Sequence, residues 1–196
     1  ESEVNIPGAM AVAATGNPRN AYDMGLLTAQ ELRSCGVDFN LAPVMDINCN
    51  PDNPVIGVRS YGDTPERVAE YGSQMVRGLL DGGVYCSLKH FPGHGDTAVD
   101  SHLGLPCIDR SFDELMQREL KPFIAGIEAG APAVMTTHIL FPQIEPEHIP
   151  ATMSRRIMTG LLREKLGFGG IIISDCMEMD AIKKFYGTVN GVLAAM

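Results

Sequence analysis

The feature of this sequence that most constrains its fold is a pattern that occurs four times: an amphipathic segment, a glycine, and a short apolar run. Glycine after the last helical turn provides a left-handed cap that ends a helix. Continuous apolar runs are typical of strands in parallel sheets, which are buried on both faces. The four units are residues 29–36 with 37–47, 75–83 with 84–91, 123–130 with 131–139, and 161–170 with 171–175. Their alternation predicts an α/β fold with a parallel sheet.

Two helix starts are also marked in the sequence. Thr64 followed by Pro65 is typical of an N-cap with proline at the first helical position. Ser111 and Glu114 have the spacing of a capping box, in which each side chain bonds to the other residue's backbone N–H. These signals predict helices that begin close to residues 65 and 112.

Each predicted strand ends in a residue that can take part in chemistry: Asp46, Lys89 with His90, His138, and Asp175. In (β/α)8 barrels the active site lies at the carboxyl ends of the strands. An open doubly wound sheet uses the same edge, but usually with a glycine-rich phosphate loop. No G-x-G-x-x-G sequence follows a predicted strand here. The pattern therefore predicts an α/β fold of the (β/α)8 TIM-barrel type.

The barrel that we expect is incomplete. A whole barrel takes about 250 residues, whereas this chain of 196 residues contains only four countable strand–helix units. We expect residues 1–196 to form one partial TIM-barrel catalytic domain that lacks the first and last strands. Because unpaired sheet edges invite pairing with another chain, we also expect self-association through residues 39–47 and 171–174.

Composition excludes several classes of partner. The net charge of −9 argues against nucleic acid or an anionic membrane surface as the main partner. No apolar run is long enough to span a bilayer. The five cysteines show no C-x-x-C pairing, which favours a reducing compartment and a cytoplasmic location. The sequence begins with Glu1 rather than methionine, so we expect the natural N-terminus to lie upstream.

Residues 89–106 are unusually rich in groups that move protons. Asp100 and His102 are two residues apart, so in an extended segment their side chains point the same way. The carboxylate of Asp100 could then orient the ring of His102, which would act as a general acid and base near neutral pH. Taken alone, such a triplet is more often a pair of polar surface residues.

The other candidate residues each have a catalytic and a structural interpretation. Asp175 could act as a nucleophile or cap a helix that follows it. Lys89 and His90 could bind substrate hydroxyls, or form an ion pair and a packed imidazole. Arg59 lies in the long loop 48–65, and such loops are often functional; the alternative is an ordinary surface arginine.

A metal site is another interpretation of this region. His90, His94, Asp96 and His102 offer nitrogen and oxygen ligands of the kind that zinc uses. No H-E-x-x-H helix is present, and the prolines and glycines of residues 89–106 prevent a regular helix. We therefore expect no metal and no organic cofactor. For His94 and Asp96 we favour a role in holding the shape of the loop.

Residues 89–102, "KHFPGHGDTAVDSH", resemble the signature of glycoside hydrolase family 3, in its β-N-acetylglucosaminidase branch. Further segments resemble that family in the same order, and the similarity extends from about residue 6 to the end of the chain. They are "LAPVMDIN" (41–48), "VIGVRSYG" (55–62), "VMTTHILFPQIEP" (134–146) and "GGIIISDCMEMDAI" (169–182).

The resemblance implies a catalytic role for three residues. Asp175 matches the family's nucleophile, and His102, paired with Asp100, matches the histidine acid/base of this branch. Together they imply retaining hydrolysis through a covalent glycosyl-enzyme. The substrate implied is a terminal β-linked N-acetylglucosamine, for example on a peptidoglycan fragment, and no cofactor is needed.

The resemblance also implies how the sugar is held. Arg59, Lys89 and His90 match positions that bind the sugar in the −1 subsite, and Asp46 matches a carboxylate that supports the site from its strand end. A family segment of the form D-x-E-G-G is absent, and the chain stops at Met196 in a predicted helix. Because these parts are missing, an inactive sugar-binding or interaction fragment stays open as an alternative. A phosphorylase is a second alternative, because an imidazole acid tolerates an incoming phosphate.

Overall fold

The computed structural model describes residues 6–97 and 105–196. Its strands are β1 (Phe39–Asn40), β2 (Tyr85–Phe91), β3 (Ala133–Thr136) and β4 (Ile171–Ile173). They form one sheet in the order β1-β2-β3-β4, and every pairing is parallel. The strand order follows the chain order, as in the wall of a barrel. This arrangement confirms the parallel α/β fold predicted from the four repeated units.

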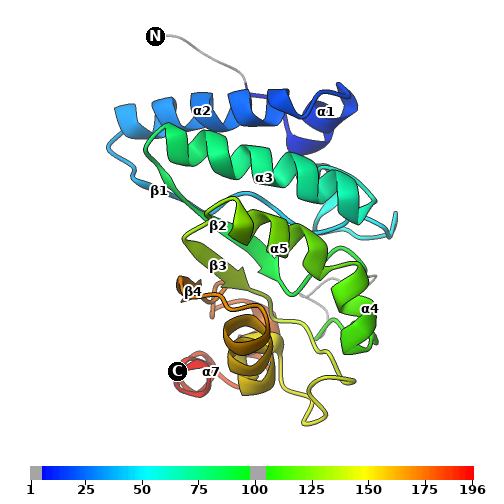
Figure 1. Ribbon diagram of the computed structural model, residues 1–196. Coiled ribbons are helices and arrows are strands. Elements are labelled where there is room, and N and C mark those ends of the chain that lie inside the picture. The colour runs from blue at the N-terminus through cyan, green and yellow to red at the C-terminus, as the bar shows by residue number, and fades with distance from the viewer. Residues whose placement is uncertain (1–5, 98–104) are drawn as a thin grey trace.

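Helices precede or follow every strand. The α-helices are α1 (Ala9–Ala14), α2 (Arg19–Ser34), α3 (Pro65–Asp81), α4 (Phe112–Gln117), α5 (Leu120–Glu128), α6 (Asp180–Lys183) and α7 (Thr188–Ala195). Two short 3-10 turns, η1 (Gly57–Arg59) and η2 (Ala151–Met153), lie in loops, and the π-helix η3 (Arg156–Lys165) leads to β4. Figure 1 shows α2, α3 and α5 stacked along one face of the sheet.

The predicted helix ends are present. The side chain of Thr64 accepts a bond from the backbone of Arg67, and Pro65 occupies the first position of α3. Ser111 and Glu114 form the capping box of α4. Three of the four amphipathic segments end in a glycine of positive φ: 75° at Gly36, 81° at Gly83 and 99° at Gly130. In the fourth segment, the glycine of positive φ is Gly167, at 65°, just after η3. Left-handed backbone of this kind favours glycine.

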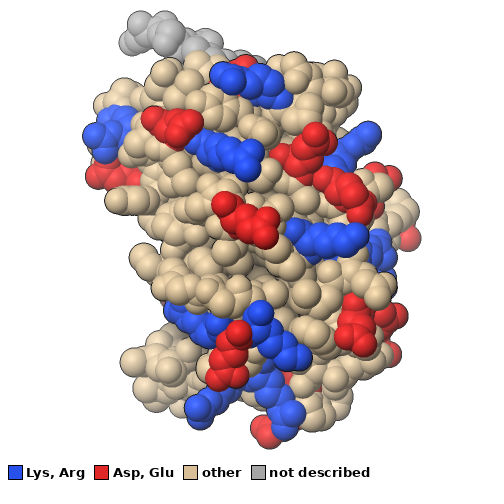
Figure 2. All heavy atoms as spheres, viewed as in Figure 1, with Lys and Arg blue, Asp and Glu red and all other residues tan. Residues whose placement is uncertain are grey.

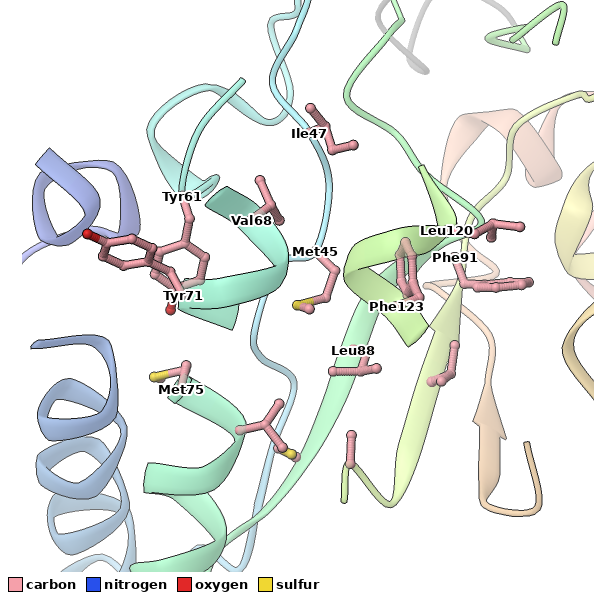
Figure 3. Packing of buried hydrophobic residues seen from close by; sticks show 14 of the residues in the cluster. Met45, Ile47, Tyr61, Val68, Tyr71, Met75, Leu88, Phe91, Leu120 and Phe123 are labelled. Atoms are coloured by element: carbon pink, nitrogen blue, oxygen red, sulfur yellow. The ribbon is translucent and has the colours of Figure 1, made fainter. Parts of the chain in front are cut away.

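The core lies between the sheet and the helices α3 and α5. Leu88 and Phe91 of β2 pack against α5, which carries Leu120 and Phe123, whereas the sulfur of Met45 is directed toward α3, at Gly72 (Figure 3). The rings of Phe91 and Phe123 meet edge to face, with centroids 5.3 Å apart, which is a favourable aromatic geometry. This packing fixes β2 against α5 and thereby fixes the end of β2, where Lys89 and His90 lie.

Helices α2 and α3 approach closely through glycines. A Cβ atom at Gly78 of α3 would lie 2.1 Å from the carbonyl oxygen of Tyr22 in α2. One at Gly25 of α2 would lie 2.6 Å from the carbonyl oxygen of Met75. The glycines are therefore needed for the two helix backbones to come this near.

The strand predictions need two corrections. The first predicted strand, residues 39–47, is regular only at β1; beyond the cis Ala42–Pro43 peptide it pairs with β2 through a single bridge between Val44 and Lys89. The expected burial of the last strand on both faces is wrong, because Ile171 is 58% exposed. In the described sheet β4 is an outer strand: one of its edges pairs with β3, and the other pairs with no described strand.

The surface carries both signs of charge. On the face shown in Figure 2, which α2, α3 and α5 form, Lys and Arg side chains are interspersed with Asp and Glu. No helix within the described residues is long and apolar enough to cross a membrane.

Candidate active site at the carboxyl ends of the strands

The polar residues predicted at the strand ends lie at one edge of the sheet. Lys89 and His90 are at the end of β2, and His138 and Asp175 each lie two residues beyond β3 and β4. Asp46 follows Val44, the residue that bridges to Lys89. Because all four strands run in parallel, their carboxyl ends share this edge.

Asp46 is the buried centre of the site. It is 1% exposed and accepts hydrogen bonds from His90, near the end of β2, and from His94, just beyond it. Its Oδ2 lies 2.7 Å from Nδ1 of His90 and 3.2 Å from the backbone nitrogen of the same residue, and its Oδ1 accepts the backbone N–H of His94 at 2.7 Å. Burial alone would raise the pKa of Asp46, but the charge and hydrogen bonds of His90 outweigh burial and lower it. Asp46 is thus an ionised carboxylate, and it orients the ring of His90.

The loop after β2 is held by its own polar residues, as predicted for His94 and Asp96. The ring of His94 lies 3.1 Å from the hydroxyl of Thr97 and edge-on to His90, with ring centroids 5.7 Å apart. Burial lowers the pKa of His94 although Asp46 opposes the shift. Asp96 binds Arg110, whose Nε lies 3.2 Å from Oδ2. Both side chains therefore shape the loop.

Lys89, Arg59 and Asp175 interact through their charges. Lys89 is half-buried, and its pKa is lowered by burial and then by the positive charge of Arg59, while Asp175 and Asp46 raise it. Arg59 is exposed, and its Nε and Nη2 donate to the carbonyl oxygen of Val55 at 3.1 and 2.7 Å. Two cations and a carboxylate thus occur together at the open edge of the site.

Asp175 does not cap a helix. Its Oδ1 accepts the backbone N–H of the next residue, Cys176, at 2.7 Å. Helix α6 begins only at Asp180, with Met179 at its N-cap. The structural alternative for Asp175 therefore does not hold, and its carboxylate stays at the strand end.

His138, at the end of the third predicted strand, has a positioning role that the sequence does not reveal. Its Nε2 lies 3.0 Å from the carbonyl oxygen of Cys176, and its Nδ1 lies 2.9 Å from the hydroxyl of Thr152. Burial lowers the pKa of His138, which favours the neutral ring at pH 7. In that state Nε2–H donates to the carbonyl oxygen of Cys176, while the Thr152 hydroxyl near Nδ1 also lies 2.9 Å from the carbonyl oxygen of Thr137. The ring fixes the backbone directly after Asp175.

Asn53 is a second residue that sequence reasoning missed. It is 7% exposed, and its amide nitrogen donates to the carbonyl oxygen of His94 at 2.9 Å and to the hydroxyl of Thr97 at 3.2 Å. An asparagine in a loop rich in proline and glycine is an ordinary turn residue. Nothing in the sequence marks this one as a contact between distant loops.

Two predicted catalytic residues, Asp100 and His102, lie outside the described residues, so their roles remain predictions. The other four predicted residues lie at or near the same edge of the sheet: Asp175, Lys89, His90 and Arg59. Within residues 6–97 and 105–196, no three His, Cys, Asp or Glu side chains are arranged to hold a metal ion.

A parallel α/β layer with carboxylates, imidazoles and cations gathered at its strand ends is the arrangement of a TIM-barrel-like catalytic face. The chain belongs to glycosyl hydrolase family 3, because residues 1–196 match the N-terminal domain of that family. The predicted TIM-barrel type is thereby confirmed, with the four-stranded sheet unclosed.

Individual relatives agree with this assignment. A β-hexosaminidase A of Pseudoalteromonas piscicida is 39% identical over 207 residues, which cover 98% of this chain and 35% of that protein. The structure of a family 3 β-N-acetylglucosaminidase from Paenibacillus sp. str. FPU-7 superposes with a TM-score of 0.96 at 50% identity, over 100% of this chain and 37% of that one. The resemblance to the N-acetylglucosaminidase branch is thus confirmed, and the chain spans little more than a third of these two relatives.

A relative with a different activity is also similar. A β-glucoside phosphorylase bound to 2FGlc superposes with a TM-score of 0.87 at 34% identity, over 91% of this chain and 34% of that one.

Proposed function

We propose that this chain carries the catalytic face of a retaining glycosidase that removes terminal β-linked N-acetylglucosamine. The observation that carries the proposal is the position of Asp175 just beyond β4, at the sheet edge where Lys89 and the buried pair of Asp46 and His90 also lie. Arg59 and Asp175 are both near enough to Lys89 for their charges to affect its pKa. A nucleophilic carboxylate beside cationic sugar-binding groups suits hydrolysis of a glycosidic bond. The β-hexosaminidase and β-N-acetylglucosaminidase relatives support this substrate class.

The reaction proceeds in two displacements. The Asp175 carboxylate attacks the anomeric carbon while the glycosidic C–O bond breaks, and the leaving oxygen takes a proton from His102. Water then attacks the same carbon, gives its proton to His102, and releases Asp175. The Asp100 carboxylate stabilises the protonated imidazole, as an aspartate does in a serine-hydrolase triad.

The residues around the nucleophile bind and orient the sugar. Lys89, Arg59 and His90 present donors for the sugar hydroxyls. Asp46 holds His90 in place through its ring and its backbone. None of these steps requires a cofactor.

A phosphorylase is the second candidate, and the β-glucoside phosphorylase among the similar structures favours it. A neutral imidazole acid/base would not repel phosphate as a carboxylate would, and Lys89 and Arg59 add positive charge at the site. If phosphate accelerates turnover and a sugar 1-phosphate accumulates, the enzyme is a phosphorylase. If phosphate has no effect, it is a hydrolase.

The nucleophile can be tested directly in the full-length protein that contains this chain. Asp175→Ala should abolish hydrolysis of a nitrophenyl β-N-acetylglucosaminide, because no neighbouring group replaces covalent catalysis. A mechanism-based fluorosugar should attach to the peptide that carries Asp175, as mass spectrometry can show. Labelling of Asp180 or Asp46 would refute the assignment. A folded wild-type protein without activity would favour a sugar-binding or interaction fragment.

The acid/base is tested by leaving-group dependence. Replacing His102 should slow substrates with poor leaving groups most, since these need proton donation, and activated nitrophenyl substrates less. Equal losses on both kinds of substrate would assign His102 a structural role.

A further inference from the structure

We infer that Asn53 is a positioning residue that ties the loop of Arg59 to the start of the segment leading to His102. The inference rests on the proposed function. Asn53 lies in the loop between β1 and α3, is buried, and uses both ends of its amide. It lies in a loop and not at the end of a strand, and it acts on the reaction only through the residues that it holds in place.

The carbonyl end of the amide fixes the loop of Arg59. Oδ1 of Asn53 accepts the backbone N–H groups of Val55 and Ile56, both at 2.8 Å. The carbonyl oxygen of Val55 in turn accepts two bonds from the guanidinium of Arg59. Asn53 therefore fixes the peptide group to which Arg59 is anchored, and so the place of its charge near Lys89.

The nitrogen end fixes a segment more than forty residues further along the chain. Nδ2 of Asn53 donates to the carbonyl oxygen of His94 at 2.9 Å and to Oγ1 of Thr97 at 3.2 Å. His94 is also held by Asp46, which accepts its backbone N–H. Thr97 is the last described residue before the segment that contains Asp100 and His102. The described chain is thus fixed up to Thr97 relative to Arg59 and to Asp46.

Only an amide of this length can make both sets of bonds. Asparagine offers two acceptor lone pairs and two N–H donors, and all four have partners here. An aspartate keeps the acceptor toward Val55 and Ile56 but faces the carbonyl of His94 without a donor. The Asn53→Asp variant therefore breaks one connection and keeps the other.

The test uses the full-length enzyme and two β-N-acetylglucosaminides, one with a nitrophenyl leaving group and one with an alkyl leaving group. Asn53→Asp should lower kcat on the alkyl substrate at least about tenfold more than on the nitrophenyl one, since general acid catalysis contributes roughly 10²–10⁴-fold. KM should change little, because the connection to Arg59 is kept. Asn53→Ala should raise KM as well.

Two further variants separate positioning from folding. Thr97→Val removes one acceptor of the Asn53 amide and should reproduce the leaving-group effect of Asn53→Asp. Asn50→Ala is the matched control: Asn50 lies in the same loop, and its side chain accepts a local bond from Asp52. It should leave both substrates unaffected. Circular dichroism and thermal unfolding establish that each variant is folded at the assay temperature.

A pH profile gives an independent readout. The new carboxyl group of Asn53→Asp regains one donor when it is protonated. The loss of kcat on the alkyl substrate, relative to wild type, should therefore become smaller as the pH falls. Equal losses on both substrates, or a folded Thr97→Val enzyme with wild-type leaving-group dependence, would overturn the inference. An inactive wild-type enzyme would instead contradict the proposed function, and the inference with it.

Discussion

Nδ1 of His90 lies 2.7 Å from Oδ2 of Asp46, and both residues are buried, 5% and 1% exposed, at the end of β2. A buried carboxylate is costly unless it is paired and hydrogen-bonded. Asp46 meets both conditions, because it also accepts the backbone N–H groups of His90 and His94. The pair joins the segment after β1 to the active-site end of β2.

Asp46→Asn should lower the free energy of unfolding at pH 7 by about 1–3 kcal/mol, since hydrogen bonds to a charged group are lost. The folded-state pKa of Asp46 lies below its usual value, so this stabilisation is present above about pH 4 and is lost as the pH falls through the lowered pKa. Urea unfolding at pH 7 and pH 3 measures it. The exposed Asp63→Asn control should stay within about 0.5 kcal/mol. The prediction would be wrong if the difference in free energy of unfolding between wild type and Asp46→Asn were larger at pH 3 than at pH 7.

The pKa of Lys89 should respond in opposite directions to its two neighbours. Arg59→Gln should raise it, because a like charge is removed, and Asp175→Asn should lower it, because an opposite charge is removed. NMR titration of lysine side-chain amines measures both shifts. Exposed Arg33, which pairs with Asp38, provides the control: Arg33→Gln should leave Lys89 unchanged. If neither active-site variant moved the pKa, the three charges would not share one site.

His138 should matter for turnover because it holds the backbone after Asp175. His138→Asn can still reach Thr152 but not the carbonyl of Cys176, so we expect kcat to fall by up to about 10²-fold with KM less affected. His148→Asn changes an exposed histidine at positive φ, where asparagine is tolerated, and serves as the control. Equal kinetics for the two variants would show that His138 does not position the nucleophile.

Glycine has opposite effects at two helical positions. Gly78→Ala should destabilise the protein by at least about 1–3 kcal/mol, because the new methyl group meets the backbone of Tyr22. Gly160→Ala should stabilise it by about 0.5–1 kcal/mol, because the new methyl group meets nothing within 4 Å beyond its own stretch of helix, and helix propensity improves. Thermal and urea unfolding compare them. A neutral Gly78→Ala would mean that α2 and α3 can separate at little cost.

The 196-residue chain by itself should self-associate. In the described sheet β1 and β4 are the outer strands, and Ile171 on β4 is 58% exposed. Exposed strand edges and apolar patches favour pairing with a second chain. Sedimentation should show association that weakens with Ile171→Lys but not with Leu27→Lys on α2. A chain that stays monomeric at every concentration would contradict this.

The sequence by itself determined the local elements and the class of protein. Gly36, Gly83 and Gly130 end helices because left-handed backbone costs glycine little, and Ser111 with Glu114 begins one because the two residues satisfy each other's backbone donors. These causes act within a few residues, so a linear pattern reveals them. The strand-end positions of Asp46, Lys89 and Asp175 follow from the same pattern.

The tertiary structure alone decided which distant residues meet. Asp46 pairs with His90 across 44 residues, and Asn53 reaches His94 across 41 residues. His138 reaches Cys176 only because β3 and β4 are neighbours. Such contacts depend on the packing of whole strands and helices, which no local spacing encodes. The partial exposure of β4 could not be predicted for the same reason. An apolar run shows that a strand is able to be buried, but its burial depends on which elements pack against it.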